Sequence, residues 1–447
     1  MRDILVLGAG LVARPLLRYL LTRPDFRVYI ATNDVERARR AMGEHPRGKV
    51  GHLDVSDTPH LAALMETADA VISLLPAELN VTVARTAIAC RKPMINTSYA
   101  SPEMWALDEE AKAAGVLLLN EMGLDPGIDH MSAAATVRRL RFAGGTVTSF
   151  VSACGGFPAV EANTNPWGYK FSWSPRGLML ASRRPARFLR DGQEVAVPGE
   201  DIFAHTWALE VQGQGVYEMY PNGDALGYIA SYGLDGARGV LRGTLRYPGW
   251  CATMGAAVRL GLFDLQPRDW PEGTTYADFT SRLLPGGGSV LGRAARFLEV
   301  SEDSDLLARL EWAGLFSDRP LPERHAAPID VFGNRLVKLM MYQPGERDMV
   351  LLKHIFTVRY PDGNGEEVRS RLVELGDPRG DTAMARTVSL TAGIGTRLIV
   401  EKSIQAVGVQ VPTLREIYEP VLEELEERGI ALQEVHIKNF RGPFAMP

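Results

Sequence analysis

The sequence has little of several features that mark particular classes of protein. Three cysteines in 447 residues are too few for a disulfide framework, and they show no metal-ligand spacing. Apolar runs such as Val116–Leu119 have the length of a strand and fall far short of a membrane span. Basic residues are dispersed and the net charge is −5, which excludes the positive surface of a nucleic-acid-binding protein. We therefore expect a cytoplasmic protein that binds neither membranes nor nucleic acid.

Length and composition limit the architecture. A chain of 447 residues is too long for one ordinary hydrophobic core, so we expect two or three domains. The composition, 46% hydrophobic and 23% charged, is typical of a globular protein. Met1 leads directly into the first predicted strand, so we expect no cleavable signal.

Residues 3–13 (DILVLGAGLVA) combine an apolar strand with the small residues Gly8, Gly10 and Ala13 and then a helical pattern. This is the spacing of the first strand–turn–helix unit of a dinucleotide-binding fold. The first glycine permits the tight turn, and the second lets a pyrophosphate approach the backbone. The helix N-terminus then attracts the phosphates. The pattern therefore predicts a bound dinucleotide.

The first 120 residues alternate between apolar strand-like runs and helical windows, which predicts a doubly wound parallel sheet. Ligands of such sheets lie beyond the C-terminal ends of the strands. This rule indicates the segments 8–10, 32–34, 75–76, 97–99 and 120–129 as the rim of the site. The cofactor contacts expected at or near this rim are Gly8, Gly10, Leu11, Val12, Thr32, Asn33, Asp34, Asp54, Val55, Leu75, Thr97, Ser98, Leu124, Asp125 and Pro126.

The rest of the chain reads as a second, mixed domain that forms the other wall of a cleft. Strand-like runs occur between 145 and 260 and again at Asp330–Met341, Met349–Tyr360 and Glu367–Glu374, while residues 262–318 are mostly helical. The expected fold class is α/β, with an N-terminal Rossmann domain, a mixed α+β substrate domain and a small helical insertion. We expect these at 1–123, at 124–261 with 328–381, and at 262–327, with C-terminal helices in 382–447 packed back on the first domain.

The segment after the second predicted strand bears on the choice of cofactor. An acidic side chain there accepts hydrogen bonds from the ribose of NAD, whereas an arginine pairs with the 2′-phosphate of NADP. Asn33 and Asp34 favour NAD, because Asp34 would repel a phosphate. Arg37, Arg39 and Arg40 follow in the next helix and leave NADP as the alternative. We predict a nicotinamide cofactor and favour NAD.

Several longer motifs resemble the glutamate-forming saccharopine dehydrogenase family over nearly the whole chain. They are VISLLP at 71–76, NTSY at 96–99, NEMGLDPGIDHM at 120–131, CGGFPA at 154–159, NPWGYKFSWSPRG at 165–177, YPNGD at 220–224 and RGTLRYPG at 242–249. The resemblance implies a reversible, NAD(P)-dependent oxidation of saccharopine, through an imine, to glutamate and 2-aminoadipate 6-semialdehyde in lysine metabolism.

The resemblance also implies roles for individual residues, and no metal. The catalytic candidates are Tyr99, Asp125 and Cys154, and Ser174 matches a cofactor-contacting position. The implied substrate contacts are Ser98, Tyr99, Asp125, Thr244, Leu245 and Arg246.

The residues themselves leave other interpretations open. Tyr99 can be a structural tyrosine at the edge of the sheet, and Asp125, before a proline, can be a turn former. Buried free cysteines such as Cys154 are usually inert. His130 is interpreted as a structural histidine, while Lys170 and Arg176 are further candidates for pairing with a substrate carboxylate.

One position departs from the family pattern. Where the family usually has an arginine that binds a substrate carboxylate, this chain has Gly223. Either a nearby cation such as Arg242 or Arg238 compensates, or the substrate lacks that carboxylate. The alternatives are therefore a dehydrogenase of another secondary amine, opine-like or carboxynorspermidine-like, and a catalytically silent dinucleotide sensor. The substrate is a small molecule in either enzymatic case, and a homodimer is possible.

Overall fold

The computed structural model describes residues 1–440, which form two compact units. Unit 1 contains residues 1–148, 228–236 and 354–440, and unit 2 contains 149–227 and 237–353. This division is coarser than the domains expected from the sequence, whose boundaries stay a prediction.

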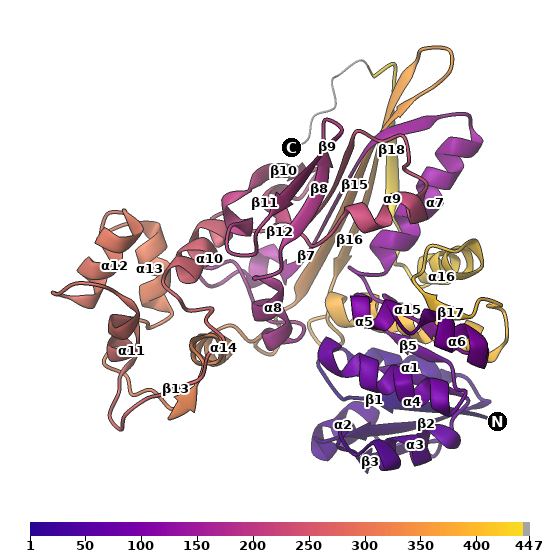
Figure 1. The fold of residues 1–447 in the computed structure, drawn as a ribbon, viewed down its shortest axis with the longest axis horizontal. Helices are drawn as coiled ribbons and strands as arrows, with labels where there is room; N and C mark the ends of the chain where they lie inside the picture. The colour runs from indigo at the N-terminus through magenta and orange to yellow at the C-terminus, as the bar shows by residue number, and fades with distance from the viewer. Residues whose placement is uncertain (441–447) are drawn as a thin grey trace. The chain divides into compact units, whose positions relative to one another are not determined.

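A seven-stranded, fully parallel sheet forms the centre of unit 1 (Figure 1). Its strand order, β17-β6-β5-β4-β1-β2-β3, reverses between β1 and β4, as in a Rossmann fold. The expected fold class is confirmed. The strands are β1 (Arg2–Leu7), β2 (Phe26–Thr32), β3 (Gly48–His52), β4 (Ala70–Ser73), β5 (Met94–Asn96), β6 (Leu117–Leu119) and β17 (Gly408–Gln410).

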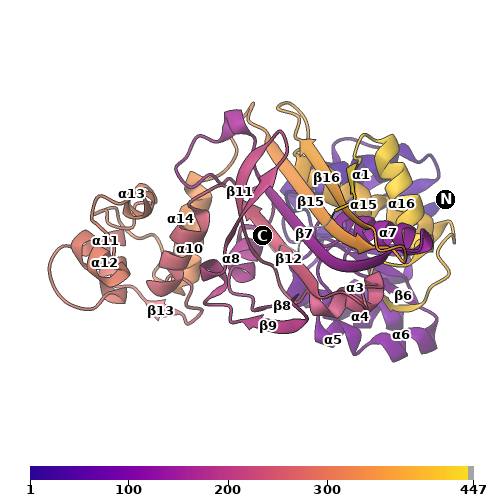
Figure 2. The same ribbon diagram turned by 90° about the horizontal axis from the view of Figure 1, so that it is seen from above.

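Helices cover the parallel sheet because its strands are apolar on both faces. The C-terminal helix α15 (Ala383–Val400) packs on α1 (Ala13–Thr22) and on α16 (Arg415–Glu427), as Figure 2 shows. The other helices of unit 1 are α2 (Val35–Met42), α3 (Thr58–Glu66), α4 (Asn80–Ala89), α5 (Pro102–Trp105), α6 (Asp108–Ala114), α7 (Ile128–Phe142) and α9 (Ile229–Tyr232).

Unit 1 also contains an antiparallel pair, β16 (Gly365–Leu375) with β18 (Gln433–Lys438). Strands β7 (Thr146–Pro158) and β15 (Asp348–Arg359) carry the chain from one unit to the other. No helix within residues 1–440 is long and apolar enough to cross a membrane.

Unit 2 is built on a mixed sheet. Strand β12 (Gly239–Arg246) is parallel to β7 and antiparallel to β11 (Gly215–Pro221) and β8 (Ala186–Arg190). The hairpin partners are β9 (Gln193–Val197) and β10 (Trp207–Val211). The remaining elements are α8 (Pro175–Ala181), α10 (Trp250–Arg259), α11 (Tyr276–Leu283), α12 (Val290–Leu298), α13 (Asp305–Trp312), α14 (Pro328–Leu339) and the short strands β13 (Arg268–Asp269) and β14 (His325–Ala326).

One predicted strand is wrong. The segment Asp330–Met341 was expected to be extended, but Pro328–Leu339 is the helix α14. Pro328 lies in its first turn, where a proline is tolerated, and the buried Ile329, Phe332 and Leu336 recur at helical spacing. The apolar run therefore follows a period of 3.6 and not of 2.

Candidate active site

The glycines of the first strand–helix turn differ in what surrounds them. Gly8 has φ +94°, and a Cβ there would lie 3.2 Å from the backbone oxygen of Leu74 at the end of the adjacent β4. Gly10 has open space, because a Cβ there would meet nothing within 4 Å. Gly8 is therefore required by the fold, whereas Gly10 leaves room for a ligand to approach the backbone.

The N-terminus of α1 lies directly beyond this space. The N-cap residue Val12 makes no side-chain capping hydrogen bond, and the Ala13 amide donates to the backbone oxygen of Gly10 at 3.2 Å. A helix N-terminus without a side-chain cap favours an anion. Gly10 is exposed, and Leu11 and Val12 are partly exposed. These features fit the pyrophosphate of a dinucleotide.

In the segment after β2, the structure shows Asp34 as a helix cap, whereas the sequence suggested a contact to the cofactor ribose. The Asp34 carboxylate accepts a hydrogen bond from the Arg37 amide at 3.0 Å and caps α2, while the Asp34 amide donates to Thr32 Oγ1 at 3.2 Å. Arg39 forms an ion pair with Glu36. Within residues 1–440 the guanidinium of Arg37 forms no ion pair. A free cation therefore stands beside a carboxylate that already serves as a helix cap.

The other expected cofactor contacts in unit 1 follow the C-terminal ends of the parallel strands. Asp54, after β3, accepts hydrogen bonds from the amide and hydroxyl of Ser56, and Val55 is buried in the core. Asn33 is exposed. Leu75 follows β4, Thr97 and Ser98 follow β5, and Leu124 and Pro126 lie in the loop after β6.

Tyr99 and Asp125 come together in the loops after β5 and β6. The Tyr99 hydroxyl donates a short hydrogen bond to Asp125 Oδ1, and both side chains are half-buried. A Cβ at Gly127 would lie 2.1 Å from the backbone oxygen of Gly123, so only glycine allows this turn of the Asp125 loop. The pair is thus a hydroxyl and a carboxylate at the ligand-binding edge of the sheet.

The expected residues of unit 2 also form a group. Cys154 is buried on β7, directly opposite Thr244 on the parallel strand β12. A Cβ at Gly155 would lie 2.5 Å from the backbone oxygen of Leu245, so the glycine lets the two strand ends approach closely. Cys154, Thr244, Leu245 and Arg246 therefore lie at one place in the sheet.

Arg246 is a buried cation with unused hydrogen-bonding capacity. It is 4% exposed, and its Nη1 donates to the backbone oxygen of Leu245 at 2.7 Å. Its guanidinium carbon lies 5.1 Å from the ring centre of Tyr169 and 5.5 Å from that of Trp250. Within residues 1–440 its Nε has no hydrogen-bond partner. A carboxylate is the natural partner for such a guanidinium.

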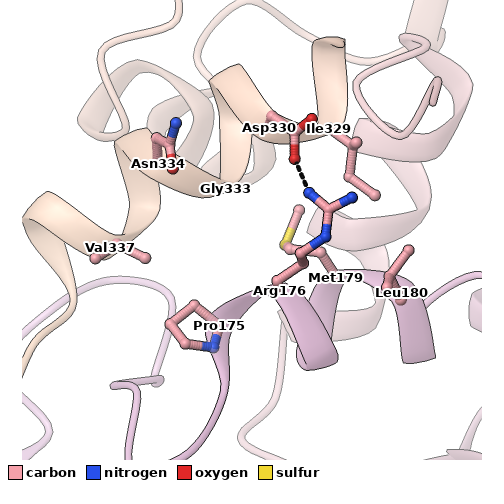
Figure 3. Close-up of a pocket in the computed structure, with 9 residues that line it drawn as sticks. All are labelled: Pro175, Arg176, Met179, Leu180, Ile329, Asp330, Gly333, Asn334 and Val337. Carbon is pink, nitrogen blue, oxygen red and sulfur yellow. Dashed lines mark hydrogen bonds and ion pairs between the residues drawn. The ribbon is translucent and has the colours of Figure 1, made fainter. Parts of the chain in front are cut away.

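Three other candidates serve structural purposes in this structure. Ser174 caps α8 by accepting from the Gly177 amide at 3.1 Å. Arg176 points from α8 to Asp330 on α14 and forms an ion pair with it (Figure 3). The pocket lined by Arg176 and Asp330 has a volume of about 100 Å³, which is too small to hold a substrate made of two joined amino acids. Lys170 is buried against Glu346 and Thr164. Lys170 and Arg176 are therefore already paired with carboxylates of the chain.

The structure adds residues that the motif analysis did not select. Glu121 is 2% exposed, lies directly after the strand β6 and accepts hydrogen bonds from Tyr228. The sequence signal was a charged residue between an apolar strand and GLDPG, but Tyr228 is distant in sequence and carries no motif. The part of the chain that the structure describes holds no cluster of His, Cys, Asp and Glu suited to a metal.

Comparison with known proteins gives matches over the whole chain. The saccharopine dehydrogenase NADP binding domain matches residues 4–119, and the saccharopine dehydrogenase C-terminal domain matches residues 123–430. A saccharopine dehydrogenase [NADP(+), L-glutamate-forming] from Schizosaccharomyces pombe is 34% identical over 97% of this chain and 99% of its own length. The mitochondrial alpha-aminoadipic semialdehyde synthase of Bos taurus is 35% identical over 96% of this chain and 47% of its own length.

A solved structure is similar over the same extent. The apo saccharopine dehydrogenase (L-Glu forming) from Saccharomyces cerevisiae has a TM-score of 0.84 and 32% sequence identity, and the match covers 98% of this chain and all of that one. The comparisons support a nicotinamide cofactor and favour NADP, so the preference for NAD drawn from Asn33 and Asp34 is corrected.

Proposed function

The chain belongs to the saccharopine dehydrogenase family, and on this premise we propose that it uses NADP to oxidise saccharopine to glutamate and 2-aminoadipate 6-semialdehyde. It is an oxidoreductase that acts on a CH–NH bond of an amino-acid substrate in lysine metabolism. The observation that carries the proposed site is the Tyr99–Asp125 hydrogen bond at the ligand edge of the parallel sheet.

The products determine which bond is oxidised. Glutamate keeps the bridging nitrogen, so the carbon that becomes the aldehyde is the one that loses a hydride. When bound, the oxidised nicotinamide accepts this hydride. The bond between the nitrogen and that carbon becomes an imine, water adds to the imine carbon, and the carbon–nitrogen bond then breaks.

We assign the proton transfers to the Tyr99–Asp125 pair. Hydride loss requires an unprotonated amine, so a base must first accept a proton from the substrate ammonium. We assign this role to the Asp125 carboxylate, acting directly or through the Tyr99 hydroxyl that hydrogen-bonds to it. The proton taken from the ammonium passes to solvent before water attacks. The carboxylate then accepts a proton from the attacking water, and the resulting acid donates it to the nitrogen as glutamate leaves.

The buried group of unit 2 supplies the proposed contacts to substrate carboxylate. Arg246 has an unpaired Nε, and the rings of Tyr169 and Trp250 restrict its guanidinium. A fixed, desolvated guanidinium binds a carboxylate more strongly than a mobile one in water. Thr244 and Leu245 precede it on β12, and Cys154 lies opposite Thr244.

We further propose that Arg37 selects NADP. Its backbone amide is bound by Asp34, which places it in the first turn of α2, just beyond the end of β2. An arginine at this position pairs with the 2′-phosphate of NADP. The match to an NADP binding domain supports this assignment.

Arg184 is the cation best placed to replace the arginine that the family has at position 223. A Cβ at Gly223 would lie 3.5 Å from Arg184 Cδ. Of the two cations suggested by the sequence, Arg238 donates to the backbone oxygen of Asp191, and Arg242 is buried within β12.

The variant Asp125→Asn tests the assignment of the proton transfers. It keeps the shape of the side chain but removes the base, so kcat with saccharopine should fall by about 100-fold or more. Binding of NADPH, measured by fluorescence titration, should stay within twofold of wild type. An unchanged kcat would contradict the role of Asp125. A cytoplasmic location and a homodimer stay predictions.

A further inference from the structure

A buried polar cluster lies behind Tyr99 and Asp125, and neither the reaction nor the cofactor accounts for it. It consists of Glu121, Asp129, His130, Tyr228 and Tyr232, which we call the Glu121 cluster. Glu121, Asp129 and His130 are at most 2% exposed. Burying such groups costs free energy unless they are paired, so their arrangement requires an explanation.

The members of the Glu121 cluster make close polar contacts with one another. Tyr228 donates to both carboxylate oxygens of Glu121, at 3.1 and 3.0 Å. His130 Nε2 lies 2.9 Å from Glu121 Oε2 but without hydrogen-bond geometry. His130 Nδ1 shares a short hydrogen bond with the Tyr232 hydroxyl. The imidazole also stacks on Tyr228, with ring centres 4.5 Å apart and planes 19° from parallel.

The Glu121 cluster holds the Tyr99 loop on both sides of the tyrosine. The Glu121 amide donates to the backbone oxygen of Ser98 at 3.2 Å. Its carboxylate accepts from the Ala100 amide at 3.0 Å. The edge of the His130 ring meets the Tyr99 ring, with centres 6.3 Å apart. Tyr99 is thus fixed at its backbone and at its ring.

The Glu121 cluster holds the Asp125 loop as well. Asp129 Oδ1 accepts a hydrogen bond from the Gly127 amide at 2.7 Å. Asp129 and His130 lie in the first turn of α7, which follows this loop directly. Glu121 itself has φ +64°, a strained value for a residue with a Cβ. The strain persists because several contacts determine the position of Glu121 together.

We propose that Glu121 and His130, held by Tyr228 and Tyr232, are positioning residues that fix the Tyr99–Asp125 hydrogen bond for the proton transfers. This inference rests on the proposed roles of Tyr99 and Asp125. None of the cluster residues needs to touch the substrate. Their contribution is geometric, because a misplacement of about 1 Å in a catalytic group lowers a rate by up to about 100-fold.

The variant Tyr228→Phe tests the proposal with little disturbance, because it removes one hydroxyl and keeps the ring stacked on His130. We expect kcat with saccharopine to fall about tenfold, while KM for NADP stays within twofold. Tyr360→Phe is the matched control, since it also removes a tyrosine–glutamate hydrogen bond, at 2.6 Å to Glu366. The control should leave kcat unchanged. An equal loss of kcat in both variants would overturn the proposal.

A double-mutant cycle separates positioning from general stability. In a Tyr99→Phe background the hydrogen bond to Asp125 is already lost, so adding Tyr228→Phe should lower kcat no further. If Tyr228→Phe lowers kcat in the Tyr99→Phe background by the same factor as in wild type, the proposal is contradicted.

Amide exchange gives a readout that does not depend on turnover. The Ala100 amide should exchange about tenfold faster in Tyr228→Phe than in wild type, and should not change in Tyr360→Phe. If wild type does not oxidise saccharopine, the proposed function fails, whereas the exchange result still decides whether Glu121 is held by Tyr228. An unchanged rate at Ala100 would overturn the inference.

Discussion

Arg37 is the side chain on which the choice between NADP and NAD depends in this account. Arg37→Ala should raise KM for NADP at least about tenfold, the cost of losing a charge-assisted contact to the 2′-phosphate, and should change KM for NAD by less than twofold. Arg39→Ala is the control on the same helix, because Arg39 is paired with Glu36. Initial rates at varied NADP and at varied NAD give the KM values for both variants. Equal losses for NADP and NAD in Arg37→Ala would contradict the assignment.

Arg184 carries a second prediction at the level of single residues. If it replaces the arginine missing at position 223, Arg184→Ala should raise KM for saccharopine by about tenfold or more and leave KM for NADP unchanged. Arg238→Ala is the control, because that guanidinium is directed to the backbone oxygen of Asp191. If Arg238→Ala has the larger effect, the assignment of Arg184 is wrong.

At the level of elements, the two glycines of the first strand–helix turn have different roles, because Gly8 is required for folding and Gly10 for cofactor binding. Gly10→Ala fills open space, so it should leave the melting temperature within about 2 °C of wild type and weaken NADPH binding at least about tenfold. Gly8→Ala should lower the melting temperature, because Gly8 has φ +94° and a Cβ there approaches Leu74. Thermal melts and fluorescence titrations distinguish the two. Full binding in Gly10→Ala would contradict the proposed pyrophosphate site.

The edge strand β18 should be the element most sensitive to acid. Burial alone would raise the pKa of Glu366, but hydrogen bonds from Lys438, Tyr360 and His436 outweigh it and hold the pKa at about 2. Because this pKa lies below that of an unfolded chain, about 4.3, the stabilisation is complete above about pH 4.5 and is lost as the pH falls towards 2. The protection factors of the Gln433–Lys438 amides, which compare the measured exchange with the intrinsic rate at each pH, should therefore fall over that range. Glu366→Gln should abolish this dependence, and a dependence that persists in the variant would contradict it.

The elements that the sequence predicted well are those with a local signal. The parallel sheet was predictable because its strands, except the edge strand β3, are apolar on both faces and each helix follows within a short turn. The strand predicted at Asp330–Met341 is wrong because a short apolar run fits both periods, and the proline at its start was the better indicator of the helix α14. The short hairpin strands β8, β9 and β10 were missed because each has only five residues, too few for a pattern of alternation to stand out in the sequence.

The candidate site was predictable where the motif is local or the family resemblance fixes a role. Tyr99 and Asp125 were both selected, and the structure adds the hydrogen bond between them. The Glu121 cluster was missed because Tyr228 and Tyr232 come from a segment about a hundred residues away along the chain. His130 was expected to be structural; it is buried, and we propose that it is a positioning residue because of the partners that surround it.

At the level of the whole molecule, unit 1 is assembled from three stretches of the chain. Strand β17 pairs with β6 and completes the parallel sheet, and α15 covers α1 with most of its residues buried. The short helix α9, which carries Tyr232, also belongs to unit 1, although β11 and β12 flank it in sequence. The cofactor-binding unit therefore depends on residues from both ends and from the middle of the chain.

Steady-state reduction of the cofactor by the 447-residue protein with saccharopine, run in parallel with NADP and NAD, decides whether the proposed reaction takes place. Amino-acid analysis then identifies the products. We expect turnover with a higher kcat/KM for NADP, and one glutamate released for each NADPH formed. Release of lysine in place of glutamate, or turnover only with other secondary amines, would contradict it.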